Sequence, residues 1–255
     1  MAEQKVTIKP KESFKISIDG YLITPDNFAG KTVGEINSME TWYGNKVVEL
    51  GSLFDIKVDG SAGPEDTTII LEGDFSRVKR IGSGMTAGKV IVNGDVDMHC
   101  GAFMTGGSIT VKGNADSWAG REMRGGELII EGNAGDYVGS SYRGEIVGMT
   151  GGKIVVKGKV GDYLGEYMSD GEIVVEGNAG ILAGVNMTGG KISIEGNADL
   201  PGAEMKKGTV IVKGDVEMLP SFRYEGTESV DSVELKKYTG DLAVRGIGKG
   251  TLFVK

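Results

Sequence analysis

The sequence predicts an all-β fold, a right-handed parallel β-helix (solenoid) of about seven to eight coils with irregular N- and C-terminal caps. Glycine accounts for 44 of the 255 residues, about 17% where an average protein has roughly 7%. With only 5 prolines and 39% hydrophobic residues, the chain is neither collagen-like nor disordered. A glycine-rich template also recurs at a short, regular period through the middle of the chain.

The template reads Gly-x-x-Met-x-x-Gly-x-(Ile/Leu/Val)-x-(Ile/Val)-x-Gly. It occurs at 82–94, 101–113, 120–132, 146–158, 165–177, 184–196 and 202–214. Only Ile146, at the first glycine of the fourth copy, departs from it. The repeated methionines are Met85, Met104, Met123, Met149, Met168, Met187 and Met205. The closing glycines are Gly94, Gly113, Gly132, Gly158, Gly177, Gly196 and Gly214, and Gly73 marks an eighth, leading coil.

The spacing of the closing glycines selects the kind of repeat. From Gly73 onward the spacings are 21, 19, 19, 26, 19, 19 and 18 residues, too short for a helix pair. Each copy holds one strand with alternating apolar residues, such as 153–157, and a Gly-Asn or Gly-Asp turn usually follows it. One such unit cannot bury its own apolar face, whereas stacked units form a continuous core. Parallel crossovers favour right-handed winding.

Two alignment columns predict which side chains face the core. Taking Gly139 as the opening glycine of the fourth coil, the preceding residues are all apolar: Ile81, Cys100, Ala119, Val138, Leu164, Ala183 and Pro201. One position earlier the residues are bulky and chemically mixed: Arg80, His99, Trp118, Tyr137, Tyr163, Leu182 and Leu200. We therefore expect the first column to face inward and the second outward. The methionines would form a core layer, since their flexible thioethers tolerate irregular packing.

The chain divides into three parts by this pattern. Residues 1–66 form an N-terminal cap region, 67–218 the repeat domain, and 219–255 a C-terminal cap or partner-contact tail. In the first part the pattern predicts strands at 6–8, 14–18 and 47–58 and a short helix at 33–39. In the last part it predicts strands at 233–235, 242–245 and 252–255. Atypical ends are expected because an open coil exposes strand edges and core.

The fourth coil carries seven extra residues (26 less 19) within 139–146. Insertions in repeat proteins map to loops on one face, often the contact face. Two interpretations stay open: a tolerated excursion, or an interaction loop. In the second case Tyr142 and Arg143 are the natural anchors, with Glu145 beside them.

Candidate chemistry is sparse. His99 and Cys100 are adjacent but fall in the outward and inward columns, so we expect no direct activation of the thiol and assign no catalytic residue. One cysteine and one histidine do not make a metal or iron-sulfur site, and no helix follows the glycine loops to bind a nucleotide, so we assign no metal-binding or cofactor-binding residue. A left-handed hexapeptide β-helix would need an aliphatic residue at every sixth position, which the template lacks.

The charge and hydropathy patterns bear on partners and location. The net charge of -8, with scattered lysines, argues against nucleic-acid binding. No run of 18 apolar residues occurs, and residues 1–10 lack the apolar core of a signal peptide, so we expect no membrane association and a cytoplasmic location.

Two segments carry a family resemblance: Val147-Gly148-Met149-Thr150-Gly151-Gly152, and the turn from Gly132 to Gly139 with the sequence GNAGDYVG. They resemble the C subunit of formylmethanofuran dehydrogenase, with its relative in the formyltransferase/hydrolase complex of methylotrophic bacteria, and the glycine-repeat β-helix domain of glutamate synthase. Residues 22–25, 44–45 and 53–54 also look like the C subunit, which favours the first group.

The resemblance implies a non-catalytic scaffold subunit of an oxidoreductase complex that reduces carbon dioxide onto methanofuran, the first step of methanogenesis from carbon dioxide. It places the tungsto- or molybdopterin, the iron-sulfur clusters and a metal-dependent amidohydrolase site on partner subunits, with no cofactor on this chain. Two alternatives stay open: a stand-alone β-helix subunit of an archaeal-type glutamate synthase, and an independent β-helix enzyme that uses His99.

Overall fold

The protein is described here from a computed structural model, which covers residues 3–243 and 248–255. Within these residues the fold is all-β apart from short helical turns, and its main element is a thirteen-stranded, mostly parallel sheet. The strands of this sheet follow the order β17-β18-β19-β15-β13-β12-β11-β10-β9-β8-β6-β1-β5. The all-β prediction is therefore confirmed.

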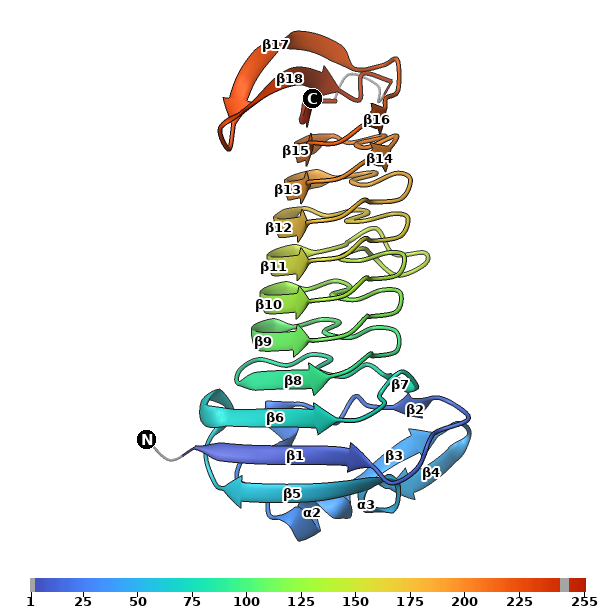
Figure 1. Ribbon diagram of the computed structural model, residues 1–255, viewed down its shortest axis with the longest axis vertical. Helices are drawn as coiled ribbons and strands as arrows, with labels where there is room; N and C mark the ends of the chain where they lie inside the picture. Colours follow the sequence, from blue (N-terminus) through green and yellow to red (C-terminus); the bar gives the residue numbers. More distant parts are fainter. Residues whose placement is uncertain (1–2, 244–247) are drawn as a thin grey trace.

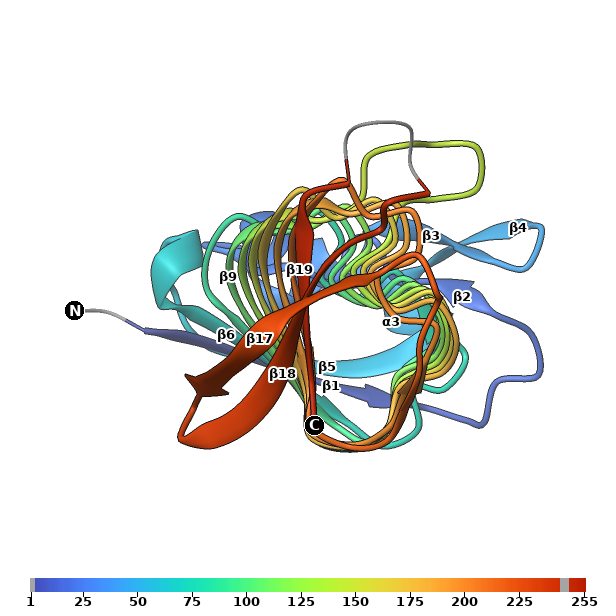
Figure 2. The same cartoon turned by 90° about the horizontal axis from the view of Figure 1, so that it is seen from above.

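The parallel strands of the sheet come from successive repeats and lie one above another (Figure 1). They are β6 (Thr67–Glu72), β8 (Lys89–Asn93), β9 (Thr105–Val111), β10 (Arg124–Ile130), β11 (Thr150–Val156), β12 (Asp170–Val175), β13 (Thr188–Ile194), β15 (Lys207–Val212) and β19 (Gly250–Val254). Each pairs in parallel with the next. Seen from above, the chain traces of successive repeats superpose (Figure 2). Equivalent residues of successive repeats are consequently neighbours in space.

The N-terminal residues extend this column at one end. Strand β1 (Gln4–Pro10) is parallel to β6, and β5 (Phe54–Gly60) is antiparallel to β1. A separate four-stranded sheet has the order β4-β3-β2-β7, and short helical turns connect these strands. The remaining elements here are β2 (Ile18–Asp19), α1 (Pro25–Phe28), α2 (Val33–Asn37), β3 (Glu40–Tyr43), β4 (Lys46–Glu49), α3 (Leu50–Leu53), η1 (Pro64–Asp66) and β7 (Val78–Lys79).

Two local predictions for this region are wrong in part. The strand predicted at 47–58 is interrupted by α3, which buries Leu50 and Leu53 and turns the chain so that β4 and β5 enter different sheets. The strand predicted at 14–18 shrinks to the two residues of β2. The helix predicted at 33–39 is present as α2, begun by a capping box between Thr32 and Glu35.

The C-terminal residues extend the column at its other end, where an antiparallel hairpin overhangs the last repeat (Figure 1). It consists of β17 (Arg223–Val230) and β18 (Val233–Gly240), and β18 pairs antiparallel with β19. Strands β14 (Ala198–Asp199) and β16 (Val216–Glu217) form a small separate sheet. Of the strand predicted at 242–245, residues 242–243 lie in a turn, and 244–245 lie outside the described residues.

The seven repeated methionines occupy the interior, each 0% exposed. Their terminal methyl groups pack on a glycine of the next strand. At Gly171, for example, an added Cβ would lie 2.8 Å from Cε of Met149 and 2.8 Å from the carbonyl oxygen of Gly152, and φ is +94°. An L side chain has neither room nor a relaxed backbone at such a position. The methionine of one copy and the glycine of the next are thus one packing unit.

The turns after the closing glycines are joined by side-chain amides and carboxylates. Oδ1 of Asn114 accepts from the backbone N–H of Asn133 at 2.8 Å, and Oδ1 of Asn133 accepts from that of Lys159 at 3.0 Å. Asn178 and Asn197 repeat the pattern further along. The closing glycines themselves approach the preceding coil closely, since a Cβ at Gly132 would lie 2.6 Å from the carbonyl oxygen of Gly113.

Candidate functional site

The outward column carries a stack of planar side chains, which we call the aromatic ladder: His99, Trp118, Tyr137 and Tyr163. Ring centroids are 5.4 Å apart between His99 and Trp118, 4.8 Å between Trp118 and Tyr137, and 5.0 Å between Tyr137 and Tyr163. The last two pairs are nearly coplanar, with interplanar angles of 5°. One ring per repeat gives this spacing, because neighbouring strands lie about 4.8 Å apart.

The ladder residues have an unusual backbone conformation. Their φ angles lie between +60° and +66°, and the equivalent Arg80, Leu182 and Leu200 share this left-handed conformation. It is costly for bulky residues. The backbone N–H of each residue donates to a carbonyl of the next repeat; that of Trp118, for example, reaches Asp136 at 2.8 Å. The stacked backbone therefore holds each ring in place.

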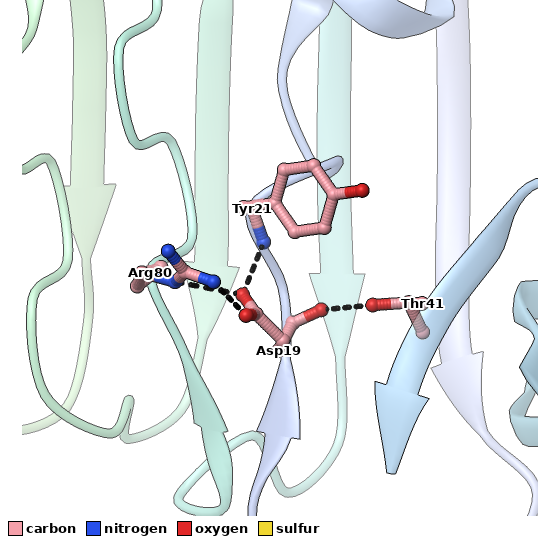
Figure 3. Close-up of polar contacts among 4 residues, drawn as sticks. All are labelled: Asp19, Tyr21, Thr41 and Arg80. Atoms are coloured by element: carbon pink, nitrogen blue, oxygen red, sulfur yellow. Dashed lines mark hydrogen bonds and ion pairs between the residues drawn. The ribbon is translucent and has the colours of Figure 1, made fainter. Parts of the chain in front are cut away.

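Arg80 continues the column toward the N-terminal region (Figure 3). Its guanidinium forms a two-pronged ion pair with Asp19, with Nε 2.8 Å from Oδ1, and lies 5.5 Å from the ring centroid of Tyr21. Oδ1 of Asp19 also accepts from the backbone N–H of Tyr21 at 3.2 Å, and the hydroxyl of Thr41 donates to the Asp19 carbonyl. This network joins the segment around β2 to the first full repeat.

The inserted residues of the fourth repeat form a loop that projects beyond the outline of the other repeats (Figure 2). Both of its ends are held by the following repeat. The backbone N–H of Ser141 donates to the carbonyl of Glu166 at 3.3 Å, and that of Gly148 to the carbonyl of Tyr167 at 3.0 Å. Ser140 is fully buried, with its hydroxyl 2.8 Å from the carbonyl of Tyr137. Between these roots, residues 142–147 are exposed; we call them the inserted loop.

The three predicted contact residues lie in this loop but do not act alike. Tyr142 folds back on the ladder, 5.8 Å from the ring of His99 and 5.7 Å from that of Trp118, and keeps 42% of its surface exposed. The Arg143 guanidinium lies 5.5 Å from the Trp118 ring centroid, and Glu145 is exposed. The geometry brings Tyr142 and Arg143 together over Trp118 and leaves Glu145 on the other side of the loop, where it lines a pocket.

Arg121, which the sequence did not single out, supports Tyr142 from behind. Its guanidinium lies 4.5 Å from the ring centroid of Phe103 and 4.6 Å from that of Tyr142, so the cation is held between two aromatic faces. Nothing in the template marks position 121, because its role depends on a loop inserted further along the chain.

A pocket of about 470 Å³ opens under the inserted loop, on the side toward the next repeat. Its lining includes four tyrosines and the two carboxylates of Glu145 and Glu166. The tyrosines are Tyr137, Tyr142, Tyr163 and Tyr167. Burial raises the pKa of Glu166 above its ordinary value, and burial and then Tyr163 and Glu166 raise that of Tyr137. Sequence reasoning missed Glu166 because it lies one repeat away from the insertion.

The loop also exposes two apolar side chains. Ile146 is 74% exposed and Val147 is 52% exposed, and Ile146 lines the same pocket. The sequence did hold a signal for Ile146, the one residue that breaks the template. Water contact with aliphatic side chains this extensive is unfavourable, and such a patch beside a pocket is typical of an interaction surface.

The His99 and Cys100 pair has the wrong properties for nucleophilic chemistry. Burial raises the pKa of the fully buried Cys100 thiol to about 12, so it stays protonated. Burial, with the charges of Arg121, Arg80 and Lys79, lowers the pKa of His99 to about 4, so the ring is neutral at pH 7 and stacks on Trp118. This arrangement packs and positions side chains; it does not generate a thiolate.

Two further findings concern the described part of the chain. Residues 3–243 and 248–255 contain no group of three or more His, Cys, Asp and Glu side chains arranged to hold a metal ion. Over the same residues, no helix combines the length and the apolar character needed to cross a membrane.

A repeat-built, all-β chain with an aromatic interaction face is the class that fold and site define, and comparison with known proteins places it more closely. No family model matches the sequence. The chain is 48% identical to the C subunit of tungsten-containing formylmethanofuran dehydrogenase 2 from Methanococcus maripaludis over 248 residues, 96% of this chain and 89% of the relative. The chain belongs to the family of formylmethanofuran dehydrogenase C subunits.

Other relatives match a shorter segment. The chain is 45% identical to the C subunit of the tungsten-containing enzyme from Methanothermobacter wolfeii over 98 residues, 38% of this chain and 36% of that one. It is 43% identical to the C subunit of molybdenum-containing formylmethanofuran dehydrogenase 1 from Methanosarcina barkeri over 99 residues, 39% of this chain and 32% of that one. In these alignments the chain spans about a third of the relative's length. The relatives thus include both tungsten- and molybdenum-containing enzymes.

A solved structure extends the likeness to the whole fold. A chain in the crystal structure of the formyltransferase/hydrolase complex from Methylorubrum extorquens, in complex with methylofuran, superposes with a TM-score of 0.88 at 31% sequence identity. The match covers 97% of this chain and 98% of that chain.

Proposed function

We propose that the chain is a non-catalytic scaffold subunit of a formylmethanofuran dehydrogenase complex, which reduces carbon dioxide and attaches it to methanofuran as a formyl group. The observation that carries this proposal is the alignment with a C subunit over 96% of the chain. The buried, protonated thiol of Cys100 and the neutral, stacked ring of His99 support a structural role for this chain within that enzyme.

The architecture we propose is a right-handed parallel β-helix of about seven to eight coils. The parallel pairing from β6 to β15 and the superposed repeats of Figure 2 support it, and the preference of parallel crossovers supports the hand. We divide it into a cap region at 1–66, a repeat domain at 67–218 and a C-terminal cap or partner-contact tail at 219–255. Each repeat is bonded to the next by backbone hydrogen bonds and stacked side chains, so the column resists bending and suits a spacer.

The partners in this proposal are the pterin-metal subunit and the amidohydrolase-like subunit of the complex, with Tyr142, Arg143 and Glu145 among the contacts. We place the tungsto- or molybdopterin and the iron-sulfur clusters on those subunits. A [4Fe–4S] cluster needs four cysteine thiolates and this sequence has one cysteine, which supports that placement. The complex would act in the cytoplasm.

Affinity purification of the tagged chain from its native source tests the proposal. We expect molybdopterin-type and amidohydrolase-type subunits to co-purify with stoichiometric tungsten or molybdenum. Glutamine amidotransferase and flavin-binding chains in their place would support the glutamate synthase alternative. Turnover by the isolated chain, abolished by His99→Phe, would instead support an independent enzyme.

A further inference from the structure

The pocket under the inserted loop combines aromatic rings with a net negative charge. Glu145 and Glu166 contribute two carboxylates to its lining and Arg143 contributes one guanidinium. Among the described residues, the Glu166 side chain makes no ion pair or hydrogen bond, although the residue is half-buried. A carboxylate in this position is poorly solvated and gains from an incoming cation.

The aromatic ladder ends at this pocket. Tyr163 stacks on Tyr137 on one side, and the equivalent residue of the next repeat is Leu182, so within the described residues the stack goes no further. Tyr167, shortly before the strand of the same repeat, adds another ring to the lining. Aromatic faces next to a carboxylate form a favourable environment for a guanidinium, which stacks on rings and pairs with carboxylates in one geometry.

Arg143, the cation already present in the lining, is engaged elsewhere, because its guanidinium lies over the Trp118 ring. The exposed side chains of Ile146 and Val147 form an apolar rim beside the pocket. A free small cation would leave that rim in water, whereas a protein surface that inserts one side chain would cover it. Interfaces concentrate their binding energy in such a central pocket with an apolar surround.

We propose that the pocket lined by Tyr163, Tyr167 and Glu166 receives an arginine side chain from a partner subunit, which the loop residues Ile146 and Val147 help to cover. The inference rests on the proposed function, since it requires a partner subunit. It gives the two sides of the inserted loop different roles. Tyr142 fastens the loop to the ladder, and the other side of the loop frames the arginine site.

The test measures binding of the full chain to the remaining subunits of the complex, with the wild type and five variants. Glu166→Gln removes the charge at constant size, Glu166→Lys reverses it, and Tyr163→Leu replaces the last rung by the residue of the next repeat. Glu176→Gln is the matched control, an exposed glutamate after β12. Arg143→Gln tests whether the pocket's own cation competes with the incoming one.

We expect Glu166→Gln and Tyr163→Leu each to raise the Kd roughly tenfold or more, as loss of a charged hot-spot contact does. Glu166→Lys should abolish binding, Glu176→Gln should match the wild type, and Arg143→Gln should bind at least as tightly as the wild type. Unchanged melting temperatures would show that the variants fold.

Wild-type-like affinity of both Glu166→Gln and Tyr163→Leu would overturn the arginine site and leave the proposed function standing. Tighter binding by Glu166→Lys would overturn it too, because the partner would then present an anion. A wild-type chain that associates with no other subunit of the complex would overturn both proposals.

Discussion

The column has two longitudinal rows of side chains that obey different rules. The inner row is chemically uniform, seven methionines that are all fully buried. The outer row places residues as different as Arg80, Trp118 and Leu182 in one backbone conformation. The backbone therefore imposes geometry on both rows but restricts side-chain identity only where neighbouring coils must interlock. Variation along the outer row is consequently where function can be written into a repeat.

The interlock of the inner row should fail most severely when a side chain is added to its glycines. In Gly171→Val the new side chain meets the Gly152 carbonyl and the Met149 methyl group at a φ of +94°. We expect a loss of about 4 kcal/mol or more, from overpacking and strain together. Urea denaturation monitored by circular dichroism measures it.

Gly144→Ala is the matched control for this change. Its φ is +88°, but a Cβ there meets no atom within 4 Å, so only the backbone strain of about 1 kcal/mol remains. Equal losses for the two substitutions would contradict the interlock.

Removing the methionine side of the same unit should cost less, because it leaves a cavity without a clash. Met149→Ala is expected to lower the free energy of unfolding by about 3 kcal/mol. Met98→Ala, at a half-buried methionine outside the template, is the control and should lose much less. A similar loss at both sites in urea denaturation would show that the inner row has no special role.

The outer row should reveal itself through pH. The folded-state pKa of His99 is lowered to about 4 from an ordinary 6.5, so the unfolded chain binds the proton more readily. Stability should accordingly fall as the pH drops from about 6.5 toward 4. Between pH 7 and pH 5 we expect a contribution of about 1 to 2 kcal/mol, discounted for solvent contact.

His99→Phe keeps a ring in the ladder and removes this titration. The difference between its stabilities at pH 7 and pH 5 should be smaller than that of the wild type by the same amount, as measured by urea denaturation at each pH. An identical pH dependence in the two proteins would show that His99 is equally protonated in both states.

The smallest effect is expected at the start of the outer row. Asp19→Asn weakens the ion pair with Arg80, whose side chain is 43% exposed, and should lower stability by about 1 kcal/mol. Asp55→Asn is the control, since its pair with Lys11 spans 4.0 Å at an exposed site. Hydrogen exchange should show faster opening of β2 and β3 in Asp19→Asn alone. Unchanged exchange there would mean that the N-terminal region is held by other contacts.

Much of the fold was predictable because the repeat makes local pattern and global neighbourhood coincide. A residue in one copy packs on its equivalent in the next, so an alignment of the copies also predicts contacts. The strand of each copy and the inward position of residues such as Cys100 follow from it. Outside the repeat this shortcut is lost, and the helical turn α3, which separates β4 from β5, was missed.

The candidate site was predictable only in part, for the same reason. The sequence located the insertion and two of its residues, Tyr142 and Arg143. It did not show that Tyr142 turns back onto Arg121 and the ladder, or that Glu166 lies under the loop. An insertion has no equivalent in the other copies, so nothing in the repeat says which way it folds.

By itself the sequence determined the period, the strands and the identity of the interior, because glycine and methionine at fixed spacing allow few other ways of stacking. The tertiary structure decided which outward residues meet. Tyr142, Arg121 and Glu166 belong to three different repeats, and only the path of the inserted loop brings them to one surface. That path depends on where the loop's polar ends find hydrogen-bond partners, namely the carbonyls of the next repeat.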